Sequence, residues 1–384
     1  MSDSPLAGPQ KELDELIAQF EEEVRRRPTP DEIAAAEAAG ETIEPLAPAE
    51  MQEPAAAVAP APPASESPPP SVAAAAAIAA VEDLHAWWAG GERIELELSG
   101  GARRRIFTRV LGDGPWMTLV HGFPTSSWDW APVAPQLAGH NRLLAFDLLG
   151  FGDSDKPSGH DWSAYEQADI IEATWRHFDV EETRVVAHDV GLTVALELLA
   201  RQEEGKLATR VIDFTLLNGG VYSGFHRPRR IQELLQKPVL GFLLARVLSE
   251  ERFSKALAEV FAEAHQPTPG EMHQQWESVV RRGGSKNYHR LIKYIPERRA
   301  NKDRWETAVE KTSAPIRFIW GMADPVSGAH MAEVIQERRP GADIVKLEDV
   351  GHYPQLESPQ RVAAAIIEGP RPAAAHSEEK DGQH

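Results

Sequence analysis

The chain has 384 residues, a mass of 42.3 kDa and a formal net charge of −19. Nucleic acids and anionic membranes both require a basic surface, so we expect neither as a partner of so acidic a chain. Cysteine is absent, which excludes a disulfide scaffold, a thiol nucleophile and a cysteine-ligated metal. No apolar stretch approaches the roughly 20 residues that span a bilayer, and the first residues lack a secretory pattern, so we expect a cytoplasmic protein.

The composition changes along the chain. Residues 1–84 hold 17 acidic and 4 basic side chains, 13 of the 30 prolines and 22 alanines. Such a segment buries too little apolar surface to offset its chain entropy, so it predicts a disordered acidic arm. Residues 370–384 are polar and rich in alanine and proline, and they predict a disordered tail.

One stretch of the arm has a helical pattern. Five apolar residues recur at the spacing of a single helical face: Leu13, Leu16, Ile17, Phe20 and Val24. A helix over residues 13–24 would offer a docking surface for a protein partner or for the body of the protein itself. A transient helix in a solubilising tail explains the same pattern.

From about residue 90 onward, short apolar runs alternate with helical patterns. The alternating segments 93–98 and 104–110 flank Gly100-Gly101 and predict a β-hairpin. Buried strands are predicted at 117–120, 143–146, 184–187, 211–217, 316–320 and 343–347, and helices at 163–178, 191–202, 328–338 and 359–367. This alternation predicts an α/β protein with a mostly parallel, eight-stranded sheet that helices cover on both faces.

A long helical segment interrupts the alternation. Between Leu217 and Pro315 no strand is evident, whereas apolar residues recur with helical spacing. An insertion after the sixth strand would cover the carboxyl ends of the strands, where ligands bind in open α/β folds. We therefore expect a helical cap at 221–300, inserted between two parts of the core, 85–220 and 301–369.

The strongest chemical signal lies at the end of a predicted strand. The sequence Ala187-His188-Asp189-Val190-Gly191 leads from strand to helix across a tight turn with small residues on both sides. Such an elbow exposes a nucleophilic side chain at the top of the sheet, and here that side chain is Asp189. Alternatively, Asp189 only caps the helix that follows.

Two further residues and one loop complete the pattern. Asp324 and His352 each follow a predicted strand, and the order nucleophile, acid, histidine is typical of α/β-hydrolases. The segment His121–Pro124 (HGFP) follows another strand. In this fold the amide after the nucleophile and one from this loop form an oxyanion hole, so the donors would be the amides of Val190 and Phe123.

Four longer segments carry a family resemblance. They are HGFPTSSWDW (121–130), LGFGDSDKP (149–157), LLNGGVY (216–222) and HYPQLE (352–357). Together with the aspartate elbow, they resemble the α/β-hydrolases that use an aspartate nucleophile, the epoxide hydrolase and haloalkane dehalogenase group. Within that group, the chain most resembles the family of the mesoderm-specific transcript protein.

The resemblance implies a two-step reaction that needs no cofactor and no metal. Asp189 attacks a saturated carbon of a small molecule and forms an alkyl ester. His352, oriented by Asp324, then activates the water that hydrolyses this ester. Some related dehalogenases place the acid where this chain has Asn218, whose amide cannot serve, and this favours Asp324 as the acid.

The resemblance also bears on the substrate. Dehalogenases of the group bind the leaving halide with side-chain N–H groups at the positions held here by Phe123 and Val190, which lack them. Epoxide hydrolases protonate the opened ring from cap tyrosines. The candidates for this role and for the wall of the pocket are Tyr222, Tyr288, Tyr294, His289 and Trp128. His289 is included because it aligns with the tyrosine of the family's motif.

We therefore expect epoxide hydrolase-like action on a neutral, apolar small molecule. Haloalkane dehalogenation is the alternative reaction. A second alternative, from another class, is a non-catalytic interaction protein that keeps the hydrolase fold and binds a partner through residues 13–24.

Overall fold

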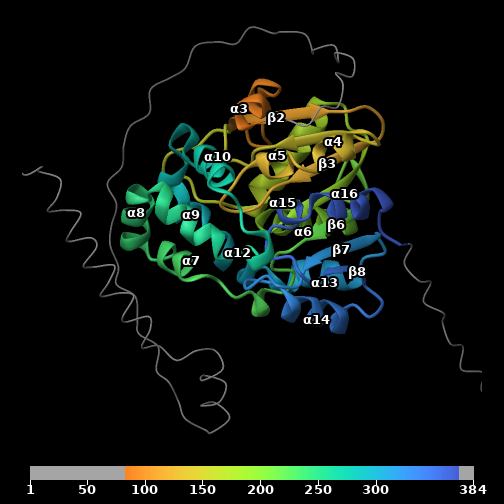
Figure 1. Cartoon of the computed structure of the whole chain (residues 1–384). Coiled ribbons are helices and arrows are strands. Elements are labelled where there is room, and N and C mark those ends of the chain that lie inside the picture. Colours follow the sequence, from red (N-terminus) through yellow and green to blue (C-terminus); the bar gives the residue numbers. More distant parts are fainter. Residues whose placement is uncertain (1–82, 372–384) are drawn as a thin grey trace, which may run out of the picture. The chain divides into compact units, whose positions relative to one another are not determined.

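The computed structural model describes residues 83–371 and contains one large sheet (Figure 1). Its strand order is β1-β2-β4-β3-β5-β6-β7-β8, and β2 is antiparallel to both of its neighbours, whereas all other pairs are parallel. The strands are β1 (Glu92–Glu97), β2 (Arg103–Leu111), β3 (Trp116–Val120), β4 (Arg142–Phe146), β5 (Glu182–His188), β6 (Arg210–Leu217), β7 (Ile316–Gly321) and β8 (Asp343–Leu347). The predicted eight-stranded, mostly parallel sheet is confirmed.

The central strands are continuously apolar because helices cover the sheet. All six residues of β7 are buried, as are the last four of β5. Four flanking helices lie where the sequence predicts them: α5 (Ala164–His177), α6 (Val190–Glu203), α14 (Ala329–Arg338) and α16 (Pro359–Glu368). The stretch of α6 from Val190 to Ala200 is buried on every side, which fixes the start of this helix, and Asp189 before it, against the sheet.

The segment between β6 and β7 contains helices and no strand. These helices are α7 (Arg230–Leu235), α8 (Pro238–Val247), α9 (Glu250–Ala258), α10 (Pro269–Val280), α11 (Tyr288–Leu291), α12 (Tyr294–Ala300) and α13 (Lys302–Lys311). Figure 1 shows α7 to α10 and α12 grouped beside the sheet, in green and teal. Helix α13 returns to the sheet, where the indole of Trp305 donates to Glu197 of α6 at 2.9 Å.

The folded body begins earlier than the composition suggests. Asp83 caps the helix α3 (Leu84–Ala89), in which Leu84 and Trp87 are fully buried. Asp83 and Leu84, which the composition assigns to the arm, are therefore part of this helix. At the other end, the amide of Arg371 donates to Asp343 of β8 at 2.9 Å, inside the tail expected from residue 370.

The remaining predictions for the two ends concern residues outside those described. They are the arm up to residue 82, the helix over 13–24 and the tail from residue 372. Within residues 83–371, every helix is too short or too polar to cross a membrane.

Candidate active site

Asp189 occupies a strained turn between β5 and α6. Its backbone has φ +48° and ψ −107°, a region that residues other than glycine rarely adopt and that costs on the order of 1–3 kcal/mol. Its side chain makes no capping hydrogen bond to α6, so the alternative of a simple helix cap is not what the structure shows. The strain instead presents the carboxylate at the end of the sheet.

Close backbone contacts explain the small residues around this turn. A Cβ atom on Gly191 would lie 2.5 Å from the carbonyl oxygens of both Val120 and His121. A Cβ atom on Gly122 would lie 2.9 Å from the Cβ of Asp189. The elbow and the loop after β3 therefore fit together only with glycine at both positions.

The imidazole of His352 lies between two carboxylates. Its Nδ1 is 2.8 Å from Oδ2 of Asp324, and its Nε2 is 3.8 Å from Oδ1 of Asp189. All three side chains are almost completely buried. The structure thus brings together the three residues predicted as nucleophile, acid and base.

Several donors hold the Asp324 carboxylate as an anion. The amide of Val326 donates to Oδ1 at 2.7 Å, and the hydroxyl of Ser327 and the amide group of Asn218 donate to Oδ2 at 2.7 and 2.9 Å. Burial alone would raise the pKa of Asp324, but the charge of His352 and these hydrogen bonds outweigh it, so the pKa is lowered. Asn218, which the sequence did not favour as the acid, is therefore a hydrogen-bond donor to Asp324.

The same electrostatics act on His352. Burial alone lowers the pKa of His352, but the charge and hydrogen bond of Asp324, together with the charge of Asp189, outweigh burial and raise the pKa to about 9. In the resting site the imidazole is therefore protonated near neutral pH and forms an ion pair with both carboxylates.

The loop predicted to form an oxyanion hole contacts the Asp189 carboxylate. The amide of Phe123 donates to Oδ2 of Asp189 at 3.0 Å. Burial raises the pKa of Asp189, while the charges of His352 and Arg298 and the amides of Phe123 and Val190 lower it. The Phe123 amide already binds the carboxyl oxygen that would become negative if water attacked an ester of Asp189.

Two of the candidate tyrosines flank Phe123. The Tyr294 ring is 5.8 Å and the Tyr288 ring 5.2 Å from the Phe123 ring. The Tyr288 hydroxyl donates to the carbonyl of Pro124 at 2.6 Å, so its proton is already used in a hydrogen bond to the backbone. The Tyr294 hydroxyl accepts from Gln232 at 2.9 Å and keeps its own proton to donate. Burial and the charge of Asp189 raise the pKa of Tyr294.

The other three candidates lie elsewhere, which corrects the expectation. His289 packs on Phe242, with ring centres 5.5 Å apart, and not on the loop after β3. Trp128 is partly buried and packs against the core, with its ring centre 6.1 Å from that of Trp87. The ring of Tyr222 lies under the guanidinium of Arg338 at 4.7 Å, and its hydroxyl is surrounded by surface charges rather than by the triad.

Arg298 is a site residue that the sequence did not reveal. It lies on α12, is 3% exposed, and donates from Nε and Nη2 to the hydroxyl of Thr193 at 3.1 and 2.6 Å. In the sequence it is one of two adjacent arginines and resembles a solvated cap surface. The only available signal was spacing, because Tyr294 and Arg298 are four residues apart and share a helical face.

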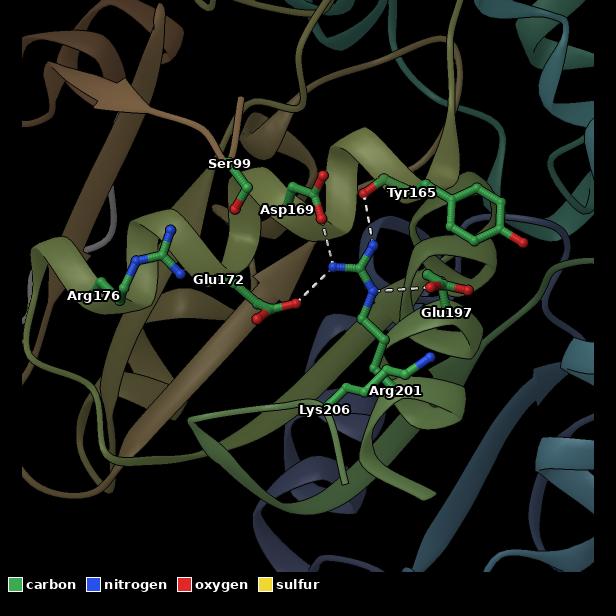
Figure 2. A pocket seen from close by; sticks show the side chains of 8 residues that line it. All are labelled: Ser99, Tyr165, Asp169, Glu172, Arg176, Glu197, Arg201 and Lys206. Atoms are coloured by element: carbon green, nitrogen blue, oxygen red, sulfur yellow. Dashed lines mark hydrogen bonds and ion pairs between the residues drawn. The ribbon is translucent and has the colours of Figure 1, made fainter. Parts of the chain in front are cut away.

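A charged groove lies between α5 and α6 (Figure 2). It has a volume of about 350 Å³ and shares no lining residue with the triad. Arg201 at its centre donates to Asp169 and Glu172 at 2.6 Å and to Glu197 at 2.8 Å. Its charges satisfy one another, so the groove serves to join two helices. Among residues 83–371, no group of three or more His, Asp or Glu is placed to hold a metal ion.

Comparison with known proteins agrees with this geometry. A model described as "Alpha/beta hydrolase family" matches residues 119–365. The putative hydrolase LipZ of Mycobacterium tuberculosis is 39% identical over 264 residues, which cover 68% of this chain and 91% of LipZ. The mesoderm-specific transcript homolog protein of Bos taurus is 36% identical over 287 residues, 72% of this chain and 84% of that protein.

A solved structure shares the fold. Haloalkane dehalogenase DatA from Agrobacterium tumefaciens C58 superimposes with a TM-score of 0.59 at 21% identity, over 73% of this chain and 96% of DatA. The expected resemblance to the mesoderm-specific transcript family is confirmed. With a family model that spans the elbow, Asp324 and His352, the chain belongs to the alpha/beta hydrolase family.

Proposed function

We propose that the protein is a hydrolase that forms and then hydrolyses an alkyl ester on Asp189, with an epoxide as the reacting group. The observation that carries this proposal is the residue at the elbow. A buried carboxylate stands there, with one oxygen on the Phe123 amide and the other facing His352. A carboxylate in this place can attack a saturated carbon and leave a stable ester, whereas a serine esterase requires a hydroxyl.

In the first step, Oδ1 of Asp189 forms a bond to an epoxide carbon, and the bond from that carbon to the ring oxygen breaks. The resulting alkoxide takes the proton of the Tyr294 hydroxyl, which no acceptor holds among residues 83–371. Because burial raises the pKa of Tyr294, its phenolate is unstable and regains a proton from the charged His352. The imidazole is then neutral and ready to act as a base.

In the second step, neutral His352 takes a proton from water, and the hydroxide attacks the carboxyl carbon of the ester. The amides of Phe123 and Val190 stabilise the oxyanion, and Asp324 stabilises the imidazolium. Collapse releases a diol and restores the Asp189 carboxylate and the charged imidazole. The sum of both steps is addition of one water to one epoxide.

Loss of halide would give the same ester, so dehalogenation is the alternative. The fold shared with DatA is compatible with it. However, a leaving halide needs N–H donors, and the side chains of Phe123 and Val190 beside Asp189 supply none. The free hydroxyl proton of Tyr294 suits an alkoxide, which must be protonated, better than a halide, and this favours the epoxide.

The test is to trap the ester. The variant His352→Gln should still be alkylated but should not hydrolyse the ester, so its intact mass should rise after incubation with a panel of epoxides and haloalkanes. The double variant Asp189→Asn/His352→Gln is the control and should gain no mass. A gain equal to a whole epoxide supports the proposal, and a gain equal to a haloalkane less its hydrogen halide supports the alternative. A folded variant that gains no mass from either set contradicts both reactions and favours the non-catalytic protein.

A further inference from the structure

A buried cation near the nucleophile has no anionic partner. The guanidinium of Arg298 forms no ion pair with any carboxylate among residues 83–371. Burying a charge is costly unless it is paired. The neutral hydroxyl of Thr193 and the Tyr294 ring, whose centre is 5.2 Å from the guanidinium, offset only part of this cost. Such a side chain is retained when it acts on something that the folded chain itself does not supply.

One edge of this guanidinium has no hydrogen-bond partner among the described residues. Nε and Nη2 both point to Thr193, which uses two of the five N–H donors of an arginine. Nη1 is shielded from solvent and has no hydrogen-bond partner within residues 83–371. The N–H donors of Nη1 and the second N–H donor of Nη2 are therefore unused. One donor from each of these nitrogens forms a planar fork that matches the two oxygens of a carboxylate.

The surroundings of this edge connect it to the triad. A Cβ atom on Gly220 would lie 1.9 Å from Nη1, so the guanidinium packs directly against the chain after β6, and only glycine leaves room for it there. A Cβ atom on the preceding Gly219 would lie 3.1 Å from the Cα of Asp189. The unpartnered Nη1 and the nucleophile therefore both contact the same two-glycine segment.

A second unpartnered group lies nearby. Both ring nitrogens of His226 are shielded from solvent and have no hydrogen-bond partner in the part of the chain that the structure describes. The charges that act on His226 include those of Arg298, His352 and Asp324, and that of the exposed Arg299. Burial lowers the pKa of His226 well below its usual value, so it is a neutral ring with one N–H to donate.

The charge balance of the reaction also calls for an anion. While Asp189 is ionised, its charge acts on Arg298 and lowers the cost of the buried cation. Formation of the ester removes that charge, and Arg298 is then left uncompensated at the intermediate. A carboxylate carried by the substrate would replace the lost charge at this stage.

We propose that Arg298 binds a carboxylate of the substrate, with His226 as a second donor, so that the substrate is an epoxide-bearing carboxylic acid. This inference rests on the proposed function for the reacting group, but the binding itself does not require turnover. It replaces the expectation of a neutral substrate: the end that reacts is apolar and uncharged, and the other end is an anion. Arg298 is then a specificity-determining residue of the cap.

The test compares binding of hexanoate and hexanamide, which differ in charge and are nearly equal in shape, to the full chain by isothermal titration calorimetry. Wild type should prefer hexanoate by at least tenfold. Arg298→Met should lose this preference, and Arg298→Lys should keep part of it. The matched control is Arg299→Met, which removes the same charge from the exposed neighbouring residue and should reduce the preference far less than Arg298→Met, because Arg299 acts on this region only through its charge.

Each outcome decides the point. Equal binding of the two probes by wild type, or an unchanged preference in Arg298→Met, overturns the proposal. If Arg298→Met does not fold, Thr193→Val serves instead, because it keeps the charge but removes the hydroxyl that orients it, and it should reduce the preference for hexanoate. If binding of hexanoate depends on Arg298 but His352→Gln forms no ester, the proposed reaction is refuted and the carboxylate site is supported. If His352→Gln forms an ester but binding of hexanoate does not depend on Arg298, the carboxylate site is refuted and the reaction is supported.

Discussion

Replacing Asp324 by asparagine should stall the second step of the reaction while sparing the first. The variant keeps the shape of the side chain but loses the charge that holds the imidazole of His352 in its protonated form. In ester hydrolysis this charge forms when His352 takes a proton from water, so its stabilisation contributes directly to the barrier.

The magnitude follows from the pKa of His352. The rise from 6.5 to about 9 corresponds to about 3 kcal/mol of stabilisation of the charged imidazole, most of it from Asp324. Losing that stabilisation should slow hydrolysis of the ester by roughly 100-fold or more. In the first step the imidazole releases a proton instead of taking one, so alkylation should be affected far less.

Single-turnover experiments with intact mass detection separate the two steps. In Asp324→Asn the ester on Asp189 should accumulate and then decay slowly, whereas in wild type it should be short-lived. Ser327→Ala is the control, because it removes one hydrogen bond to Asp324 but leaves its charge, and it should slow decay by less than tenfold. If the ester decays in Asp324→Asn within tenfold of the wild-type rate, Asp324 does not stabilise the imidazolium and the assignment of the acid is refuted.

Three further predictions concern neighbouring groups. Tyr294→Phe should slow alkylation by an epoxide by about 100-fold or more, because the alkoxide loses its proton donor. Tyr288→Phe is the control and should have a smaller effect. Equal effects of the two variants in single-turnover mass measurements would contradict the role of Tyr294. Arg298→Met should raise the pKa of Asp189, so the rate of alkylation should begin to fall at a higher pH than in wild type when the solution is made acidic. If the acid side of the pH–rate profile does not move, the charge of Arg298 does not act on Asp189. Burial raises the pKa of Asp129 from 3.8 to about 7, above its unfolded value, so wild type loses stability as pH rises through this window. The free energy of unfolding of Asp129→Asn, measured in urea, should therefore gain up to about 3 kcal/mol relative to wild type between pH 5 and pH 8. A difference between the two proteins that does not change with pH would refute the pKa shift.

The fold was predictable because buried parallel strands leave a strong trace in the sequence. Continuous apolar runs such as β7 mark strands whose two faces are both covered, and the strands appear close to the predicted bounds. Helix α3 was missed because it has only six residues and adjoins a segment rich in alanine and proline. Composition averages over such a short helix, whereas burial of Leu84 and Trp87 is a property of the tertiary structure.

The position of the cap side chains was not predictable for a different reason. Between α10 and α11 the chain passes through an irregular turn, Arg281–Asn287, in which Arg282 and Gly283 have φ values of +52° and +73°. A turn of this kind resets the rotation of the helix that follows, so spacing alone cannot tell which of Tyr288 and His289 faces inward. The structure places Tyr288 against Phe123 and turns His289 toward Phe242.

The net charge of the chain does not exclude an anionic substrate of small size. A charge of −19 repels large anionic surfaces, because the interaction is summed over many exposed side chains and reaches about a Debye length. A small anion that enters the protein experiences the nearest buried charges instead, in a medium of low dielectric where a single cation dominates. Arg298 is buried and forms no ion pair with a carboxylate among residues 83–371, so an acidic protein can select an anionic substrate at this point without attracting anions elsewhere on its surface.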